Sequence, residues 1–151
     1  MIFILNLLWL VLGGWIAGLA WLLAGVIMAL TIIGLPWARS CFMLARYSFW
    51  PFGYEIIARD QLYGQEDIGT GTLGTIGNVI WFVLGGWWLA LMHISAAVAL
   101  AVTIIGIPFA WAHVKLAIAS LFPVGKTVVA TDRLWPMQST PPKQISRNQT
   151  A

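Results

Sequence analysis

The feature that most constrains this 151-residue sequence is an ungapped internal repeat. The segment NLLWLVLGGW, which starts at Asn6, recurs as NVIWFVLGGWW, which starts at Asn78. The offset from Asn6 to Asn78 is 72 residues, and TIIGLP at Thr31 and TIIGIP at Thr103 keep the same offset. Self-similarity at a fixed period indicates one structural unit written twice. We therefore expect a fold of two matched halves.

Both copies are strongly apolar. Hydrophobic residues make up 60% of the chain and charged residues 9%, and the mean hydropathy is +0.87. A soluble domain carries roughly 25% charged residues. Residues 2–36 carry no charge, and residues 79–108 contain His93 as their one ionisable side chain. Each segment exceeds the ~20 residues that cross a bilayer, so the sequence predicts an all-α, multi-pass integral membrane protein surrounded by lipid.

Each long apolar segment ends at a Gly-x-Pro turn. These turns are formed by Gly34 with Pro36 and by Gly106 with Pro108. Glycine allows a left-handed helix end, and proline suits the first turn of the next helix. Each copy is therefore predicted to hold a long transmembrane helix, a turn and a short membrane or interfacial helix, at about 37–50 and 109–122.

The first long helix is expected to be longer than the bilayer core. A helix over residues 7–33 would measure about 40 Å, against about 30 Å of hydrocarbon. We therefore expect the long helices to tilt, to bend at the glycine pairs 13–14 and 85–86, or to project into the headgroups.

Four segments follow from this organisation. They are membrane repeat 1 (1–56), an acidic, Gly/Thr-rich connector (57–77), membrane repeat 2 (78–130) and a polar tail expected to be disordered (131–151). The Gly/Thr run within the connector predicts a hinge between the copies.

The short helices leave two architectures open. At roughly 14 residues each would span only ~21 Å, and they contain Arg39, Arg46 and Lys115. If they cross a thinned bilayer, the protein has four spans and parallel repeats. If they lie at the interface or re-enter, it has two spans and inverted repeats. The positions of Lys and Arg favour four spans. We therefore expect parallel copies, cytoplasmic termini and connector, and outward-facing Gly-x-Pro turns.

Small residues form a matched face in both long helices. The residues are Gly14, Gly18 and Gly25 in the first copy, and Gly86, Ala90 and Ala97 in the second. Small residues at this spacing let helix backbones approach closely in lipid. The face predicts either packing of one copy on the other or the interface of a homo-oligomer.

A few polar residues interrupt the apolar segments. Asn6, Asn78, Thr31, Thr103 and His93 are candidates to line a polar path. Each also has a structural alternative. The asparagines can cap helix starts, and the threonines can bond back to carbonyls before the turns. His93 can bond a neighbouring helix as a neutral side chain, and the sequence indicates no second titratable group of the relay type at its depth.

Several chemistries are disfavoured. No arrangement of catalytic residues is present, so no enzymatic activity and no cofactor are expected. Cys41, His93 and His113 lack the spacing of metal ligands. The net charge of +3 is spread without a dense basic patch, which argues against nucleic acid. The tryptophans, Trp15, Trp37 and Trp50 among them, are expected to anchor the protein at membrane interfaces.

The motifs also resemble a known family. The pattern N-x-x-W-x-V-L-G-G-W, then T-I-I-G-x-P, then S-x-x-P-x-G is present twice and covers about residues 6–128. It resembles the YccF family of bacterial inner-membrane proteins. The resemblance implies a duplicated inner-membrane component domain in the cell inner membrane, and it supplies no catalytic or ligand residues.

Two functions are compatible with these patterns. The first is an oligomeric channel or small transport component for ions or small polar solutes, suggested by broken helices and repeated polar residues. The alternative is a non-transporting accessory subunit that packs against a partner membrane protein, suggested by the small size and the absence of acids from the apolar segments. A membrane enzyme is the least favoured reading.

Overall fold

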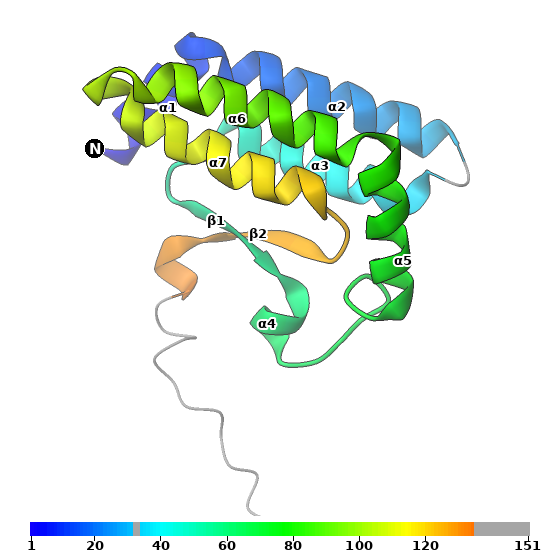
Figure 1. Cartoon of the computed structure of the whole chain (residues 1–151). Helices are drawn as coiled ribbons and strands as arrows, with labels where there is room; N and C mark the ends of the chain where they lie inside the picture. Colours follow the sequence, from blue (N-terminus) through cyan, green and yellow to red (C-terminus); the bar gives the residue numbers. More distant parts are fainter. Residues whose placement is uncertain (32–33, 135–151) are drawn as a thin grey trace, which may run out of the picture.

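The computed structural model describes residues 1–31 and 34–134, and the two repeats fold alike (Figure 1). Repeat 1 consists of α1 (Ile2–Trp9), a π-helical turn η1 (Leu10–Gly14), α2 (Trp15–Leu30), α3 (Leu35–Phe49) and β1 (Tyr54–Ala58). Repeat 2 consists of α5 (Thr72–Trp81), a π-helical turn η2 (Phe82–Gly86), α6 (Trp87–Ala101), a 3₁₀ turn η3 (Ile104–Gly106), α7 (Ile107–Leu121) and β2 (Lys126–Ala130). The short helix α4 (Arg59–Tyr63) lies between them.

The predicted fold class is confirmed, since the described chain is mostly helical and its domain occurs twice. Within residues 1–31 and 34–134, three helical stretches are long and apolar enough to cross a membrane: Ile2–Leu30, Thr72–Ala101 and Ile104–Leu121. Helix α5 begins within the segment expected to be a hinge. Part of the Gly/Thr run therefore continues the second long helix instead of loosening it.

The long helices bend at their glycine pairs, which is one of the three possibilities that the sequence left open. Gly13 has φ of 118° inside η1, a conformation that glycine adopts without the Cβ penalty of other residues. Gly85 in η2 breaks the helix with extended φ and ψ near zero. Such π-type interruptions bend a helix without ending it.

Each Gly-x-Pro turn closes a helical hairpin, α2 with α3 and α6 with α7. The expected left-handed glycine is wrong, because Gly34 and Gly106 have φ of −79° and −75°. Glycine is needed at both positions because there is no room for a Cβ atom. A Cβ at Gly34 would collide with the Met28 carbonyl, and one at Gly106 would collide with the Leu100 carbonyl.

A two-stranded antiparallel sheet joins the repeats. Strands β1 and β2 pair so that Ile56 lies opposite Val128, and these two residues are equivalent under the 72-residue offset. An approximate two-fold axis therefore passes between them. The sheet was not expected from an all-α reading, because neither strand has a partner near it in the sequence.

The two hairpins point in opposite directions (Figure 1). Trp9, at the base of repeat 1, stacks on Phe109, beside the turn of repeat 2, with ring centroids 6.5 Å apart. The indole nitrogen of Trp37, beside the turn of repeat 1, donates a hydrogen bond to the Gly77 carbonyl at 3.1 Å. The tip of each hairpin thus lies against the base of the other.

This arrangement corrects the expected topology. Two parallel copies would place both Gly-x-Pro turns at the same end of the bundle, whereas the turns lie at opposite ends (Figure 1). The expectation that both turns face outward therefore loses its basis. Counting positive charges could not detect this, because the direction of repeat 2 is set by contacts across the repeats.

The core is built from aromatic side chains of both repeats. Its largest members are Trp9, Trp21, Trp37, Trp81, Tyr47 and Phe109. Trp37 is thus a core residue and not the predicted interfacial anchor, whereas Trp15 is exposed. The cross-repeat stacking is itself repeated, because Trp9 on Phe109 and Trp81 on Trp37 are equivalent pairs.

Charge divides the protein into two layers. The apolar layer comprises α1, α2, α5, α6 and the π-helical turns, and no Asp, Glu, Lys or Arg occurs in these elements. The charged layer comprises the sheet, α4, residues 64–71 and the sides of α3 and α7 that contact them. In Figure 1, α2 and α6 lie on one side of the bundle and the sheet with α4 lies on the other.

Candidate functional site

The two repeated asparagines act as clasps within their own repeats. The Asn6 side chain donates to the Phe52 carbonyl at 2.9 Å and accepts from the Phe52 N–H at 3.0 Å. Asn78 bonds Val124 in the same way, at 3.0 and 2.9 Å. Both asparagines lie inside helices, so the helix-capping alternative is wrong. The fully buried Asn6 presents no amide to a solute.

The two repeated threonines stabilise the hairpin turns. The hydroxyl of Thr31 donates to the Met28 carbonyl at 2.9 Å and accepts from the Gly34 N–H at 3.1 Å. Thr103 makes the equivalent bonds to Leu100 and Gly106. These hydrogen bonds to nearby backbone groups were the predicted alternative to a polar path. Both hydroxyls are therefore bonded within their own turns.

The small-residue faces pack inside each hairpin. A Cβ added to Gly18 would lie 2.7 Å from the Phe49 ring, and one added to Gly25 would lie 2.8 Å from the Phe42 ring. Gly86 lies under Trp81 and the Ser120 carbonyl, while Gly14 is covered by Trp9. Ala90 and Ala97 are buried on the same side of α6. The close approach is therefore that of α2 to α3 and of α6 to α7, not of copy one to copy two.

His93 has a titratable neighbour, so the prediction that no second titratable group lies at its depth is wrong. Its Nδ1 lies 3.0 Å from Nδ1 of His113, and the two rings are 5.3 Å apart. His113 in turn packs against Trp9, with ring centroids 4.8 Å apart. The two histidines are 20 residues apart on facing helices, so only the hairpin geometry brings them together.

Two ion pairs hold the charged layer. Lys115 of α7 pairs with Glu55 of β1. Arg59 binds Asp67 through Nε and Nη2, with Nη2 to Oδ1 at 3.0 Å, and its backbone N–H donates to the Gly125 carbonyl at 2.9 Å. The connector is thereby fastened to the start of β2.

The surroundings shift the pKa values of two charged groups in this layer, Asp67 and Lys126. The hydrogen bond from Arg59 lowers the pKa of the Asp67 carboxyl well below its usual value, and the N–H groups of Gly69 and Thr70 act in the same direction. Burial lowers the pKa of Lys126, whose ammonium donates to the Ile118 carbonyl at 3.2 Å. At neutral pH, Asp67 is ionised and its charge is compensated.

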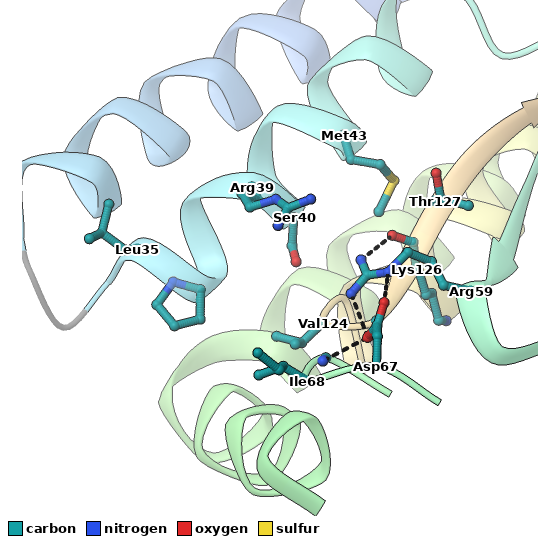
Figure 2. A pocket seen from close by; sticks show the side chains of 13 residues that line it. Leu35, Arg39, Ser40, Met43, Arg59, Asp67, Ile68, Val124, Lys126 and Thr127 are labelled. Atoms are coloured by element: carbon teal, nitrogen blue, oxygen red, sulfur yellow. Dashed lines mark hydrogen bonds and ion pairs between the residues drawn. The ribbon is translucent and has the colours of Figure 1, made fainter. Parts of the chain in front are cut away.

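The charged layer contains a cavity of about 680 Å³, which we call the basic cavity (Figure 2). Its charged lining residues are Arg39, Arg59, Lys126 and Asp67. Its other lining residues are Leu35, Pro36, Ser40, Met43, Ile68, Gly69, Val124, Gly125 and Thr127. Figure 2 shows Arg39 and Ser40 on the α3 wall and the Arg59–Asp67 pair on the opposite wall.

This cavity could not be predicted from the sequence. Arg39 is the first basic residue of α3, but Arg59, Asp67 and Lys126 come from the connector and from the second repeat. The only sequence signal was the placement of most acids in the connector, close in sequence to Arg59. No group of three or more His, Cys, Asp or Glu side chains within residues 1–31 and 34–134 is placed to hold a metal ion.

Comparison with known proteins agrees with the repeat and the apolar layer. The family profile described as the YccF inner membrane component domain matches residues 4–54 and again 76–126. The chain is 41% identical over 130 residues to the inner membrane protein YccF of Escherichia coli (strain K12), which covers 85% of this chain and 88% of that protein. The chain belongs to the YccF family. The YccF protein of Shigella flexneri is similar to the same extent, and no solved structure matches.

Family membership places this protein in the bacterial inner membrane. It also confirms the internal duplication, since the YccF domain matches once in each repeat. The family name carries no ligand or reaction, so the function has to be argued from the two layers.

Proposed function

We propose that this YccF protein is a non-enzymatic accessory component of the inner membrane. Its apolar layer faces lipid, and its charged layer lies at the cytoplasmic side, where it contacts a partner membrane protein. The observation that supports the proposal is the segregation of charge. The long helices carry none, while ion pairs, the sheet and the basic cavity gather on one side.

Helix α1 and residue 131 adjoin the same layer. The Thr131 N–H donates to the Gly53 carbonyl at 3.0 Å, and the Asn6 side chain binds residue 52. At the other end of the sheet, the Arg59 N–H of the connector donates to the carbonyl of Gly125, the residue before β2. Because α1, residue 131 and the connector border the charged layer, we propose that the termini and the connector are cytoplasmic.

Transport receives less support from the geometry. Four of the five residues predicted to line a polar path, Asn6, Asn78, Thr31 and Thr103, bond backbone groups of their own repeat. A side chain that is bonded to its own backbone offers little to a permeating ion. We therefore place the accessory role ahead of the channel.

The channel keeps one observation in its favour. The His93–His113 contact joins α6 to α7 inside repeat 2, and a histidine pair can exchange protons. If an oligomer conducts protons through this pair, His93→Gln should abolish the flux while the oligomer stays intact.

Two measurements test the proposal. Single cysteines at Tyr63 in α4 and at Thr131, in a Cys41→Ser background, should react with an impermeant thiol reagent only after the cells are opened. Purified protein in liposomes should give no flux of potassium, chloride or protons. Labelling of Tyr63→Cys from outside intact cells, or a flux that His93→Gln abolishes, would refute the accessory role as proposed.

Contact with a partner is tested in living cells. A photo-crosslinking residue at Glu66, which is exposed in the charged layer, should give a defined cross-linked protein band. The same residue at Leu84, exposed in the apolar layer, should give none. A band of twice the chain's mass from Glu66 would identify the partner as a second copy of the protein.

A further inference from the structure

We infer that the basic cavity binds a phosphate group carried by an apolar chain, with Arg39 as the cationic contact. Three cations and one carboxylate line the cavity. Because the Asp67 carboxylate is engaged by Arg59 and by the N–H groups of Gly69 and Thr70, its charge does not offset Arg39. The inference goes beyond the accessory role and does not depend on which partner is bound.

Among the described residues that line the cavity, Arg39 is the cation left free to bind a ligand. It is exposed on the first turns of α3, and neither of the two ion pairs within the described residues includes it. Arg59 is held by Asp67, and the ammonium of Lys126 is held by the Ile118 carbonyl. A guanidinium binds phosphate oxygens in bidentate geometry, and the dipole at the start of α3 favours an anion at the same end.

The remaining cavity wall suits an apolar chain. Leu35, Met43, Ile68 and Val124 line it, and Leu35 and Ile68 are exposed. Leu35 belongs to the turn that leaves the apolar layer, so the cavity opens where the two layers meet. A ligand with a phosphate at Arg39 can therefore extend its chain along these side chains.

The second repeat supplies an internal comparison. The equivalent hollow in repeat 2 has a volume of only about 90 Å³. Under the 72-residue offset, Arg39 corresponds to Trp111, whose indole lines the smaller hollow, and Met43 corresponds to Lys115. Thr127 corresponds to Glu55, so the ion pair of Lys115 with Glu55 crosses the place that stays open in repeat 1.

Within the described residues, the same backbone frame thus encloses a small hollow in repeat 2 and a large one in repeat 1, beside an arginine that belongs to neither ion pair. A purely structural hollow gives no reason for this difference, since repeat 2 shows that the frame can be filled. A ligand bound in repeat 1 would explain the difference, because it would occupy the space that Trp111 and the Lys115–Glu55 ion pair take in repeat 2.

The test measures ligand binding to the full-length protein in a non-ionic detergent. The probes are a short-chain phosphatidylglycerol, the phosphatidylcholine with the same chains, and glycerol 1-phosphate, titrated by calorimetry. The anionic lipid should bind best. Arg39→Gln should weaken its binding about fivefold, the effect of losing about 1 kcal/mol from one basic residue at an anionic lipid surface. Arg46→Gln, the matched charge loss on the same helix, should change it little.

Arg39→Trp is a more stringent test, because it places at residue 39 the tryptophan that repeat 2 has at the equivalent position, Trp111. It should abolish binding while the thermal unfolding temperature stays near that of wild type. Equal binding of glycerol 1-phosphate and phosphatidylglycerol would overturn the apolar half of the inference. Unchanged binding in both Arg39 variants, or equal loss in Arg46→Gln, would overturn the assignment of the cavity. None of these outcomes depends on partner contact or sidedness, which test the accessory role separately.

Discussion

At the scale of single residues, polar side chains in the apolar layer serve the fold. The Asn6 side chain hydrogen-bonds both the N–H and the carbonyl of Phe52. It thus satisfies the backbone of the chain after α3, as a neighbouring β-strand would. In a lipid environment these backbone groups have no water to bond instead. A residue that looks like pore lining in the sequence is therefore a structural clasp.

The clasp is tested by replacing the amide with an apolar side chain. Asn6→Leu should lower the free energy of unfolding by about 1–3 kcal/mol, because a buried N–H and carbonyl lose their partners. The effect of Asn78→Leu should be smaller, since Asn78 is only half-buried. Denaturant unfolding in detergent, followed by tryptophan fluorescence, measures both. Leu7→Ala, at an exposed neighbour of Asn6, should cost less than Asn6→Leu, and the reverse order would argue against the clasp.

Asp67 predicts a pH dependence of the connector. Its pKa is depressed in the folded protein, chiefly by Arg59, so its contribution to stability is present above the unfolded value of about 3.9. That contribution is lost as the pH falls below about 4 towards the folded pKa. Pepsin should therefore cut the connector faster as the pH is lowered through this range. Asp67→Asn should be cut quickly throughout, and a variant as resistant as wild type would exclude this anchor.

At the scale of elements, the glycines of the long helices decide how closely each hairpin packs. Gly18 faces the Phe49 ring of its own repeat, and Gly25 faces Phe42. Small residues thus bring α2 onto α3, where the sequence pattern alone also allowed a subunit interface.

A double-mutant cycle separates the two roles. Gly18→Leu should destabilise the protein by about 1–3 kcal/mol, since the added side chain overlaps the Phe49 ring. Combining it with Phe49→Ala should recover part of this loss, because the double variant removes the overlap. Unfolding in detergent measures the coupling, and sedimentation measures the oligomer. A loss of oligomer with no change in stability would instead assign Gly18 to a subunit interface.

At the scale of the whole molecule, the two hairpins run in opposite directions about an axis through the Ile56–Val128 pair. This arrangement puts the Gly-x-Pro turns at opposite ends (Figure 1). It also places the tip of each hairpin on the base of the other, so neither repeat completes its aromatic core alone.

Distance measurements between spin labels test this arrangement. Labels at Thr31 and Thr103 should lie more than about 20 Å apart, because a helix with the 15 residues of α6 is ~22 Å long. Labels at Ile56 and Val128, which are paired across the sheet, serve as the short-distance control. A Thr31–Thr103 distance as short as the control would restore the parallel arrangement.

The class, the duplication and the hairpin turns could be predicted from the sequence alone, as could the places where the long helices are able to bend. These follow from local properties, namely hydropathy over ~20 residues, the permissive backbone of glycine at Gly13, and Pro36 and Pro108 in a first helical turn. The family motifs also lie within one repeat at a time. Such features need no knowledge of what lies across the molecule.

Contacts between residues that are distant in the sequence could be learned only from the folded structure. The pairing of β1 with β2, the opposite direction of the hairpins and the contact of His93 with His113 all depend on contacts that no local period encodes. The basic cavity does as well, because α3, the connector and β2 each supply part of its wall. Hydropathy reports whether a residue faces lipid, but long-range packing determines which of the few charged residues meet, and in this protein that choice creates the candidate site.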